Sequence, residues 1–354
     1  MNVIHLPTSV GGNAWGLSRG ERKQGLKSDV LYATNDWLDY PCDIQIPYSR
    51  FLPCRYFRRA CAFFGLLGQY DVFHFNYGKT LFDWFGVLDN LELPLLRSKK
   101  ICVTYNGCDA RQKFKTIERE EICCCKYANC YNGVCKNIGI DKIKEKRIEK
   151  FRKANASFFS LNPDLMHFLP EETVFLPYTI SSWDNIKRGE YSAGKKNPLC
   201  VVHAPTDRIV KGTDAVIKAV ESINARKPNS IELVLVENVS NREALIKYEK
   251  ADIVVDQLRI GWYGGFAVEV MKMGKPVVAY INEKDLRFIP EEMAKDCKEA
   301  IINANEFNIE EILSSYVEDR TQLGIKREAQ MEYVNKWHNP KYVASITKKK
   351  YEEM

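Results

Sequence analysis

The stretch from Asp252 to Tyr280 constrains the fold of this chain more than any other. A short apolar run between two aspartates predicts a buried strand at Asp252–Asp256, and Pro276–Tyr280 predicts a second strand. Between them lie a glycine-rich turn and a short helix that begins near Gly265 and ends at Gly274. Strand, turn, helix and strand in this order are typical of α/β proteins, whose parallel strands are buried on both faces.

The turn in this stretch contains two adjacent glycines, Gly264 and Gly265, and is followed by Glu269. Backbone N–H groups at the start of a helix bind phosphate, and glycine lets a ligand approach them closely. The Glu269 carboxylate would accept hydrogen bonds from two ribose hydroxyls. A simpler interpretation is an ordinary loop with a glutamate that complements the helix dipole. The motif alone favours the simpler interpretation, so its surroundings decide.

Strands and helices alternate over most of the chain and predict two doubly wound α/β domains. We place the first at 1–180 and the second at 181–335, joined by the polar segment Ser181–Pro198, with a C-terminal helix at 336–354. The predicted strands are Val3–Leu6, Asp29–Ala33, Tyr70–Asn76, a strand that begins at Lys100, Ala156–Ser160, Thr173–Pro177, Leu199–His203, Ile231–Val236, Asp252–Asp256, Pro276–Tyr280 and Glu299–Ile302. The clearest helices are Cys54–Gly68, Asp141–Lys153, Lys211–Arg226 and Asn241–Lys250.

The composition limits the classes of partner. The 354 residues are 45% hydrophobic, which is enough for two full cores, and the net charge is +6. A mild positive excess fits an anionic ligand or an acidic membrane surface and is too small to argue for nucleic acid. No charged and apolar leader is visible, and the longest apolar run, Ala60–Gly68, is too short to span a bilayer. We therefore expect a cytoplasmic protein.

The predicted helix Cys54–Gly68 is both basic and aromatic. Such a helix either rests on an anionic membrane or packs in a core with a solvated basic face, and the second arrangement is the more common. The first would make the protein peripheral at the inner face of a membrane. Its aromatic and apolar side is formed by Phe57, Cys61, Phe64 and Leu67, and its basic side by Arg55, Arg58 and Arg59.

Twelve cysteines are many for a cytoplasmic protein, and six of them crowd into one insertion at about 108–140. Four thiolates there would form a structural zinc site, but the spacing is not the usual Cys-x-x-Cys pair. Buried or free thiols are the favoured interpretation, and we expect no required metal. The six are Cys108, Cys123, Cys124, Cys125, Cys130 and Cys135.

The first domain offers a few candidate site residues of its own. Gly11 and Gly12 follow the first predicted strand and predict a tight turn that opens a helix. Asp109 follows the strand that begins at Lys100 and would face a cleft with Arg111, or it would close a simple Asx turn beside a solvated arginine. His74, near the end of its strand, is a second candidate for contact with an acceptor.

Four segments of the second half together resemble the GT-B glycosyltransferases, and most closely the retaining family 4. In order they are a strand with a basic loop that ends in Lys-Gly, an Ala-Asp before a strand, a helix with Gly-x-x-x-Glu, and Gly-x-Pro-Val. Here they are Val202–Gly212, Tyr248–Asp252, Gly261–Glu269 and Met273–Val277. The first half matches more loosely, through Gly11-Gly12, Asp71–His74, Asn106–Asp109 and Leu176-Pro177. The resemblance covers nearly the whole chain except the cysteine segment.

The resemblance implies two Rossmann-like domains that face each other across a cleft, with C-terminal helices that cross back to the first domain. It implies an enzyme that moves a sugar from a UDP- or GDP-sugar to a hydroxyl of a glycan or lipid-linked acceptor, with retention of anomeric configuration and without a metal. Lys211 would contact the donor diphosphate and Glu269 the ribose. The donor site would also include Gly11, Gly12, Gly264, Gly265, Phe266 and Ala267.

Three positions depart from the family pattern. Gly261 stands where a sugar-contacting glutamate is expected, and the backbone amides of Tyr263 and Gly264 would have to substitute for it. Thr206 stands where an arginine is expected, and Arg208 would supply that charge. Asn106 replaces the histidine of the His-Gly-x-Asp turn. The candidates for catalysis are therefore Lys211, Arg208, Glu269 and Asp109.

Two alternatives stay open at this point. A sugar-nucleotide epimerase shares the two-domain architecture, and a protein that binds a nucleotide-sugar without turnover would explain the missing glutamate. The residues do not identify the sugar, the base or the acceptor.

Overall fold

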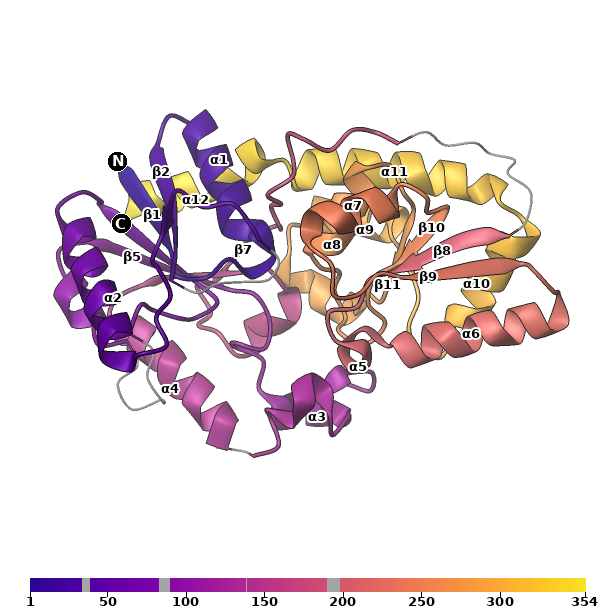
Figure 1. Cartoon of the computed structure of the whole chain (residues 1–354), viewed down its shortest axis with the longest axis horizontal. Helices are drawn as coiled ribbons and strands as arrows, with labels where there is room; N and C mark the ends of the chain where they lie inside the picture. The colour runs from indigo at the N-terminus through magenta and orange to yellow at the C-terminus, as the bar shows by residue number, and fades with distance from the viewer. Residues whose placement is uncertain (34–38, 83–89, 138, 190–197) are drawn as a thin grey trace. The chain divides into compact units, whose positions relative to one another are not determined.

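The computed structural model describes residues 1–33, 39–82, 90–137, 139–189 and 198–354. The chain divides into two compact units (Figure 1). Unit 1 comprises Met1–Gln112, Ile138–Ser181 and His338–Met354, and unit 2 comprises Lys113–Asn137 and Ser182–Trp337. Each contains one parallel sheet flanked by helices, as the alternation of strands and helices predicts. The part of the expected linker at 190–197 lies outside the described residues.

The sheet of unit 1 has seven parallel strands in the order β3-β2-β1-β4-β5-β6-β7. The first strand is central, so the strand order reverses between β1 and β4, where Val3 pairs with Ser28 on one side and Val72 on the other. The strands are β1 (Asn2–Leu6), β2 (Lys27–Tyr32), β3 (Ile44–Gln45), β4 (Val72–Asn76), β5 (Lys100–Tyr105), β6 (Ser157–Ser160) and β7 (Val174–Phe175).

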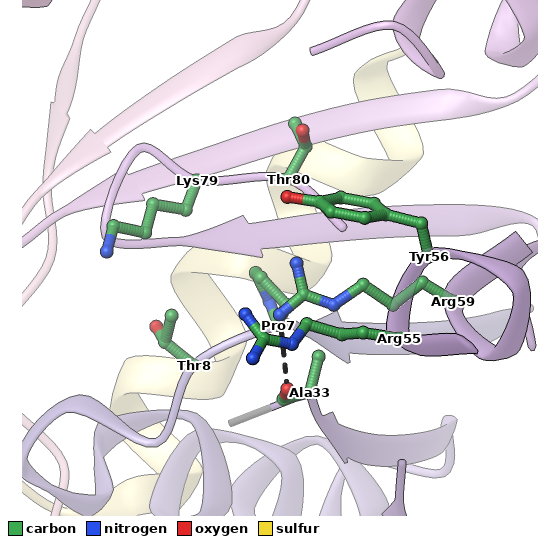
Figure 2. Close-up of a pocket in the computed structure, with 8 residues that line it drawn as sticks. All are labelled: Pro7, Thr8, Ala33, Arg55, Tyr56, Arg59, Lys79 and Thr80. Atoms are coloured by element: carbon green, nitrogen blue, oxygen red, sulfur yellow. Dashed lines mark hydrogen bonds between the residues drawn. The ribbon is translucent and has the colours of Figure 1, made fainter. Parts of the chain in front are cut away.

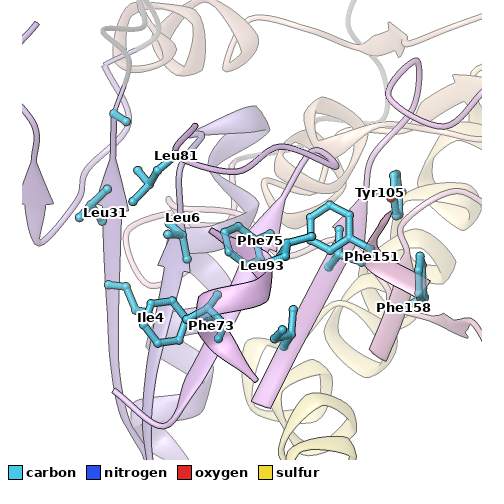
Figure 3. Close-up of a cluster of buried hydrophobic side chains, with 14 of the residues drawn as sticks. Ile4, Leu6, Leu31, Phe73, Phe75, Leu81, Leu93, Tyr105, Phe151 and Phe158 are labelled. Atoms are coloured by element: carbon cyan, nitrogen blue, oxygen red, sulfur yellow. The ribbon is translucent and has the colours of Figure 1, made fainter. Parts of the chain in front are cut away.

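Side chains alternate between the two faces of this sheet, and each face packs against helices through apolar residues. On one face Phe73 and Phe75 pack with helices α2 (Leu52–Leu67) and α4 (Gly139–Lys153) (Figure 3). On the other face Val72 packs with α1 (Asn13–Lys23) and α12 (Pro340–Glu353). Shorter helices of this unit are η1 (Val10–Gly12), η2 (Leu93–Leu96) and η5 (Pro163–His167).

The C-terminal helix α12 belongs to unit 1, where it packs against α1. The two helices approach closely at Gly20, since a Cβ there would lie 2.0 Å from the carbonyl oxygen of Pro340. Hydrogen bonds reinforce the contact: the hydroxyls of Thr347 and Tyr351 both donate to Glu21 Oε1, over 2.9 and 2.8 Å.

The sheet of unit 2 has five parallel strands in the order β12-β11-β10-β8-β9. Its strands are β8 (Leu199–His203), β9 (Ile231–Leu235), β10 (Ile253–Val255), β11 (Val277–Ala279) and β12 (Ile302–Asn303). Its helices are α3 (Lys113–Arg119), η3 (Cys124–Lys126), η4 (Cys130–Gly133), α5 (Arg208–Lys211), α6 (Thr213–Arg226), α7 (Asn241–Tyr248), α8 (Gly265–Lys272), η6 (Glu283–Phe288), α9 (Glu291–Ala300), α10 (Ile309–Glu318) and α11 (Thr321–Trp337).

Two predicted elements of unit 2 differ from the structure. The strand expected at Glu299–Ile302 begins only at Ile302, because Cys297 and Ala300 continue the buried stripe of α9. The single helix expected at Lys211–Arg226 is two helices, α5 and α6, separated by Gly212. Gly212 has a φ of +75°, a left-handed conformation that interrupts a helix.

The cysteine segment 113–137 packs in unit 2, whereas the sequence analysis placed it with the first domain. Cys123, Cys124 and Cys125 are buried in a small apolar cluster with Val210 of α5. The Cys124 amide donates to the carbonyl of Arg259 over 3.0 Å. The segment is therefore held by unit 2 although it interrupts the sequence of unit 1.

No helix among the described residues is long and apolar enough to cross a lipid bilayer.

Candidate functional site

The candidate site of unit 2 lies where the strand order of its sheet reverses. The unit enters the sheet at β8, its next strand β9 lies on one side, and β10 lies on the other. Ligands of open parallel sheets bind at such a point, outside the carboxyl ends of the strands. Helix α5 follows β8 there, and the turn before α8 follows β10.

Lys211 is fixed at this edge by the short helix α5. Asp207 caps the helix by accepting hydrogen bonds from the amides of Ile209 and Val210, over 3.0 and 2.9 Å. Lys211 is only 8% exposed. Its ammonium forms an ion pair with Asp256, whose side chain is fully buried.

Asp256 joins Lys211 to the turn before α8. One carboxylate oxygen meets Lys211 Nζ, and the other accepts the Gly264 amide over 2.8 Å. A Cβ added to Gly264 would lie 3.8 Å from Lys211 Nζ, so this turn lies directly beside the ammonium. The sequence predicts Asp256 only as the last residue of a strand and gives it no role in the site. A charged residue directly after a buried strand was the signal for its role.

The start of α8 provides backbone donors beside this ion pair. Gly265 and Phe266 open the first turn, where N–H groups have no acceptor within the helix. The Gly264 and Ala267 amides donate within the protein instead, to Asp256 and to the Gly264 carbonyl. Of the four residues predicted to form a phosphate cradle, Gly265 and Phe266 therefore offer the accessible amides. The Phe266 ring packs on Tyr248, with 4.8 Å between the ring centroids.

Glu269 lies further along α8 and is 5% exposed. Its carboxylate accepts hydrogen bonds from Ser182 Oγ over 3.0 Å and from Asn241 Nδ2 over 3.1 and 3.2 Å. Burial raises the pKa of Glu269 to about 7, and the two neutral donors lower it only in part. Ser182 and Asn241 were not singled out from the sequence, because both are distant from Glu269 along the chain.

Arg208 points elsewhere. Its side chain is 57% exposed and forms a bidentate ion pair with Glu237, over 2.6 and 2.8 Å. This pairing raises the pKa of Arg208. The cation expected to replace the missing arginine is thus held by Glu237 and has no recorded contact with Lys211.

Gly261 adopts a backbone conformation that explains why no glutamate stands there. Its φ is +83°, and a Cβ would lie 3.0 Å from Asn282 Cβ. A glutamate would be strained and crowded at this position. The backbone amides of Tyr263 and Gly264 were expected to take the place of the missing glutamate in binding the sugar. The Gly264 amide already donates to Asp256, so it is not available for this role.

In unit 1, Gly11 and Gly12 form the predicted tight turn after β1, with φ values of +63° and +68°. A Cβ on Gly12 would lie 2.9 Å from Ser181 Oγ, whereas the space beside Gly11 is open. Donor contacts of these glycines stay a prediction.

The Asp109 carboxylate folds back over the preceding turn and accepts the amides of Asn106 and Gly107, over 3.0 and 2.6 Å. The predicted Asx turn would instead bond an amide two residues further on. Burial raises the pKa of Asp109 to about 6, against the lowering effect of these amides. Its expected partner Arg111 is not solvated: it is buried and pairs with Asp164 over 2.7 Å.

His74 does not reach a ligand-accessible surface. It is fully buried and contacts the hydroxyls of Tyr351 and Thr104, each over 2.6 Å. Burial lowers its pKa well below the usual value. Among the described residues, one group of three His, Cys, Asp or Glu side chains converges closely enough to hold a metal, namely His5, Glu21 and His74. The described cysteines of 108–135 do not form such a group.

Comparisons with known proteins place this geometry in a known fold. No protein-family model matches the chain, and no curated protein sequence matches it significantly. Solved structures do match over its full length. One is sucrose-phosphate synthase from Thermosynechococcus elongatus, with 14% identity, a TM-score of 0.58, and coverage of 100% of this chain and 99% of that one.

Two further matches are an alpha-glucosyltransferase in complex with UDP and DNA, and a UDP-N-acetylglucosamine 2-epimerase from Listeria monocytogenes. The first has 11% identity, a TM-score of 0.59 and coverage of 99% and 100% of the two chains. The second has 13% identity, a TM-score of 0.51 and coverage of 100% and 97%. The chain therefore has the two-domain GT-B fold of glycosyltransferases, as the resemblance predicts. Membership of family 4 stays a prediction.

Proposed function

We propose that this protein is a glycosyltransferase that uses a nucleotide-diphospho-sugar as donor and transfers the sugar to an acceptor hydroxyl with retention. The observation that carries the proposal is the group formed by Lys211, Asp256 and the start of α8 at the strand-order reversal of unit 2. The full-length matches to glycosyltransferases support it.

In the proposed reaction the protein positions the two substrates and stabilises negative charge on the departing phosphate. The bond between the anomeric carbon and the diphosphate breaks, and a bond to the acceptor oxygen forms on the same face. The acceptor proton passes to the departing phosphate. Negative charge grows on that phosphate, so the Lys211 ammonium and the amides of Gly265 and Phe266 would stabilise it. Asp256 keeps Lys211 positioned without touching the phosphate.

Glu269 would bind the ribose, as the resemblance implies. Its carboxylate already accepts donors from Ser182 and Asn241, which use most of its lone pairs. We infer that the two ribose hydroxyls replace these donors. Since burial raises the pKa of Glu269 to about 7, ribose binding in this way would be strongest above neutral pH.

A donor-binding experiment tests the proposal. We expect UDP or GDP to raise the melting temperature of the wild type, and the substitutions Lys211→Ala and Glu269→Ala to remove the effect. Lys218→Ala and Glu221→Ala are matched controls, because both residues are exposed on α6. A wild type that responds to no nucleotide would refute the proposal.

The match to an epimerase favours a second candidate function, interconversion of a nucleotide-sugar with its epimer. Incubation with UDP- or GDP-sugars and no acceptor separates the two, because only an epimerase changes the donor's ring stereochemistry under that condition. Nuclear magnetic resonance spectra of the recovered donor report the result. Nucleotide binding without epimerisation, hydrolysis or transfer to any acceptor would favour the binding protein without turnover.

A further inference from the structure

Unit 1 has a hollow at the strand-order reversal of its sheet. It lies beyond the carboxyl ends of β1, β2 and β4 and has a cavity volume of about 120 Å³. Figure 2 shows that side chains from α2 and from the loops after the strands surround it. The lining residues are Pro7, Thr8, Ala33, Arg55, Tyr56, Arg59, Lys79 and Thr80.

Helix α2 turns positive charge towards this hollow. Its C-terminal half buries Phe63 and Leu66 in the core beneath the sheet. At helical spacing, Arg55 and Arg59 continue the same side of the helix towards its N-terminus, where apolar residues would be expected. Arg55 and Arg59 therefore line the hollow at the N-terminal end of the apolar side of α2.

Neutral oxygens hold these arginines in place. Arg59 donates to the carbonyl oxygens of Leu81 over 2.8 Å and Ala33 over 3.3 Å. Arg55 donates to the Ser49 carbonyl and the Tyr48 hydroxyl, each over 2.9 Å. Contacts with neutral oxygens orient a guanidinium, and those of Arg55 do so without cancelling its charge.

Lys79 adds a third cation from the loop after β4. Among the described residues, neither Arg55 nor Lys79 has a carboxylate within 4.0 Å. Among the described residues of the lining none is acidic, and its other polar groups besides Tyr56 are the hydroxyls of Thr8 and Thr80. Arg55 and Lys79, with Arg59 beside them, create a field that favours a dianionic ligand.

The opposite side of α2 is apolar and exposed. Phe57 is 69% exposed and Phe64 is 62% exposed, and they lie two turns apart on the helix. These rings do not line the hollow. An exposed aromatic side next to a cationic hollow is typical of proteins that bind a phosphate at a membrane surface, which makes the source of the phosphate testable.

We propose that the hollow lined by Arg55, Arg59 and Lys79 binds a phosphate group of the acceptor. The acceptor is then a phosphate ester, either a soluble sugar phosphate or a phospholipid headgroup. The assignment to the acceptor rests on the proposed glycosyltransferase function, whereas the phosphate site itself does not.

Calorimetric titration with inorganic phosphate tests the site directly, with UDP present to occupy the donor site. We expect saturable binding that weakens at least about tenfold in the double substitution Arg55→Gln and Lys79→Gln, because it removes two charged hydrogen-bond donors from the lining. Arg58→Gln is the matched control: it removes a charge from the same helix, but Arg58 is exposed and outside the lining. Circular dichroism confirms folding of each variant. Equal affinity in the two variants, or no saturable binding, overturns the proposal.

Vesicles distinguish the two sources of phosphate. Co-sedimentation with phosphatidylcholine vesicles that contain phosphatidylglycerol, and not with phosphatidylcholine alone, identifies a headgroup if it is lost in the Arg55→Gln and Lys79→Gln variant but kept in Arg58→Gln. Phosphate binding without co-sedimentation identifies a soluble phosphate ester.

Failure of the proposed function leaves a different pattern. If UDP does not bind, the phosphate titration still separates the two variants, and only the assignment to an acceptor is lost. If UDP binds as proposed and the variants take up phosphate equally, the donor site stands and the phosphate site is refuted.

Discussion

Lys211 and Arg208 are three positions apart, but their side chains point in different directions and pair with different carboxylates. Lys211 is buried against Asp256, and Arg208 is exposed against Glu237. From the sequence both were candidates for a donor diphosphate. The position of Lys211 after β8 was predictable because a Lys-Gly pair ends the basic loop, and its contact with the diphosphate stays a prediction. The direction of Arg208 depends on Glu237, which lies far along the chain. Asp256, Ser182 and Asn241 were not predicted for the same reason: their partners are set by tertiary structure.

The buried ion pair between Lys211 and Asp256 predicts that substitutions of its two residues have strong and non-additive effects on stability. Lys211→Met should lower the free energy of unfolding by about 3–5 kcal/mol, because it leaves the Asp256 charge buried without a partner. The double substitution Lys211→Met and Asp256→Asn should recover much of this loss. Arg208→Met, the control for a paired but exposed cation, should have little effect on the free energy of unfolding. Urea denaturation measures all three, and strictly additive losses would contradict the buried pair.

Glu269 predicts a pH-dependent stability. Its pKa is about 7 in the folded protein and about 4.5 when unfolded, so between these values the folded state holds a proton that the unfolded state has lost. Its contribution to stability therefore falls as pH rises from 4.5 to 7. Relative to the wild type, Glu269→Gln should gain up to about 3 kcal/mol over this range. Glu221→Gln should show no such trend, and a flat difference for Glu269→Gln would contradict the assignment.

At the scale of elements, the order of strands and helices was largely predictable and their ends were not. Periodicity identified β1, β4, β8 and β10, because parallel strands are short apolar runs between breakers. The break at Gly212 and the late start of β12 depend on packing that a local pattern does not contain. The cysteine segment could be recognised as an insertion, but the unit that it packs against is decided by contacts with Val210 and Arg259.

The close approach of α1 and α12 at Gly20 predicts that a glycine-to-alanine substitution has opposite effects on stability in α1 and in α2. Gly20→Ala should destabilise the protein by about 1–3 kcal/mol, because its Cβ would collide with the Pro340 carbonyl. Gly65→Ala should stabilise it by about 0.5–1 kcal/mol, since Gly65 is an exposed α2 residue with open space at its Cβ position. Thermal unfolding of the two variants provides the comparison. Equal shifts would mean that α12 does not pack tightly at Gly20.

Glu21, which accepts the hydroxyls of α12, predicts a pH dependence opposite to that of Glu269. Burial by itself would raise its pKa, but the charge of His5 and hydrogen bonds from His5 and Ser28 lower it to about 2, below the usual 4.5. Its stabilising contribution is thus complete above pH 4.5 and is lost as pH falls towards 2. Glu21→Gln should destabilise the protein near neutral pH by up to about 3 kcal/mol and have little effect near pH 2. Acid titrations of variant and wild type, followed by circular dichroism, test this.

At the scale of the whole molecule, the two units have separate cores and separate candidate sites. Hydrogen exchange should therefore show that UDP protects amides around α5 and the turn before α8, while the strands of unit 1 keep their exchange rates. The Lys211→Ala variant serves as the control without donor binding. Protection confined to unit 1 would mean that the nucleotide binds there, which would contradict the proposed site in unit 2.

The fold of the molecule was predictable because two α/β alternations and four motifs occur in order along one chain. The path of the chain between the units was not predictable, because units 1 and 2 are each built from separate stretches of sequence.

The position of α12 has a consequence for how the protein is made. β1 and α1 of unit 1 are synthesised before most of unit 2, but one face of their sheet is covered by α12, which is synthesised after unit 2. Until α12 has been made, Val3, Leu17 and Val72 lack their final cover, and Glu21 lacks two of its donors. A premature stop after Trp337 would thus leave unit 2 whole and unit 1 without one of its helices. Unit 1 therefore begins to be made before unit 2 and completes its core after it.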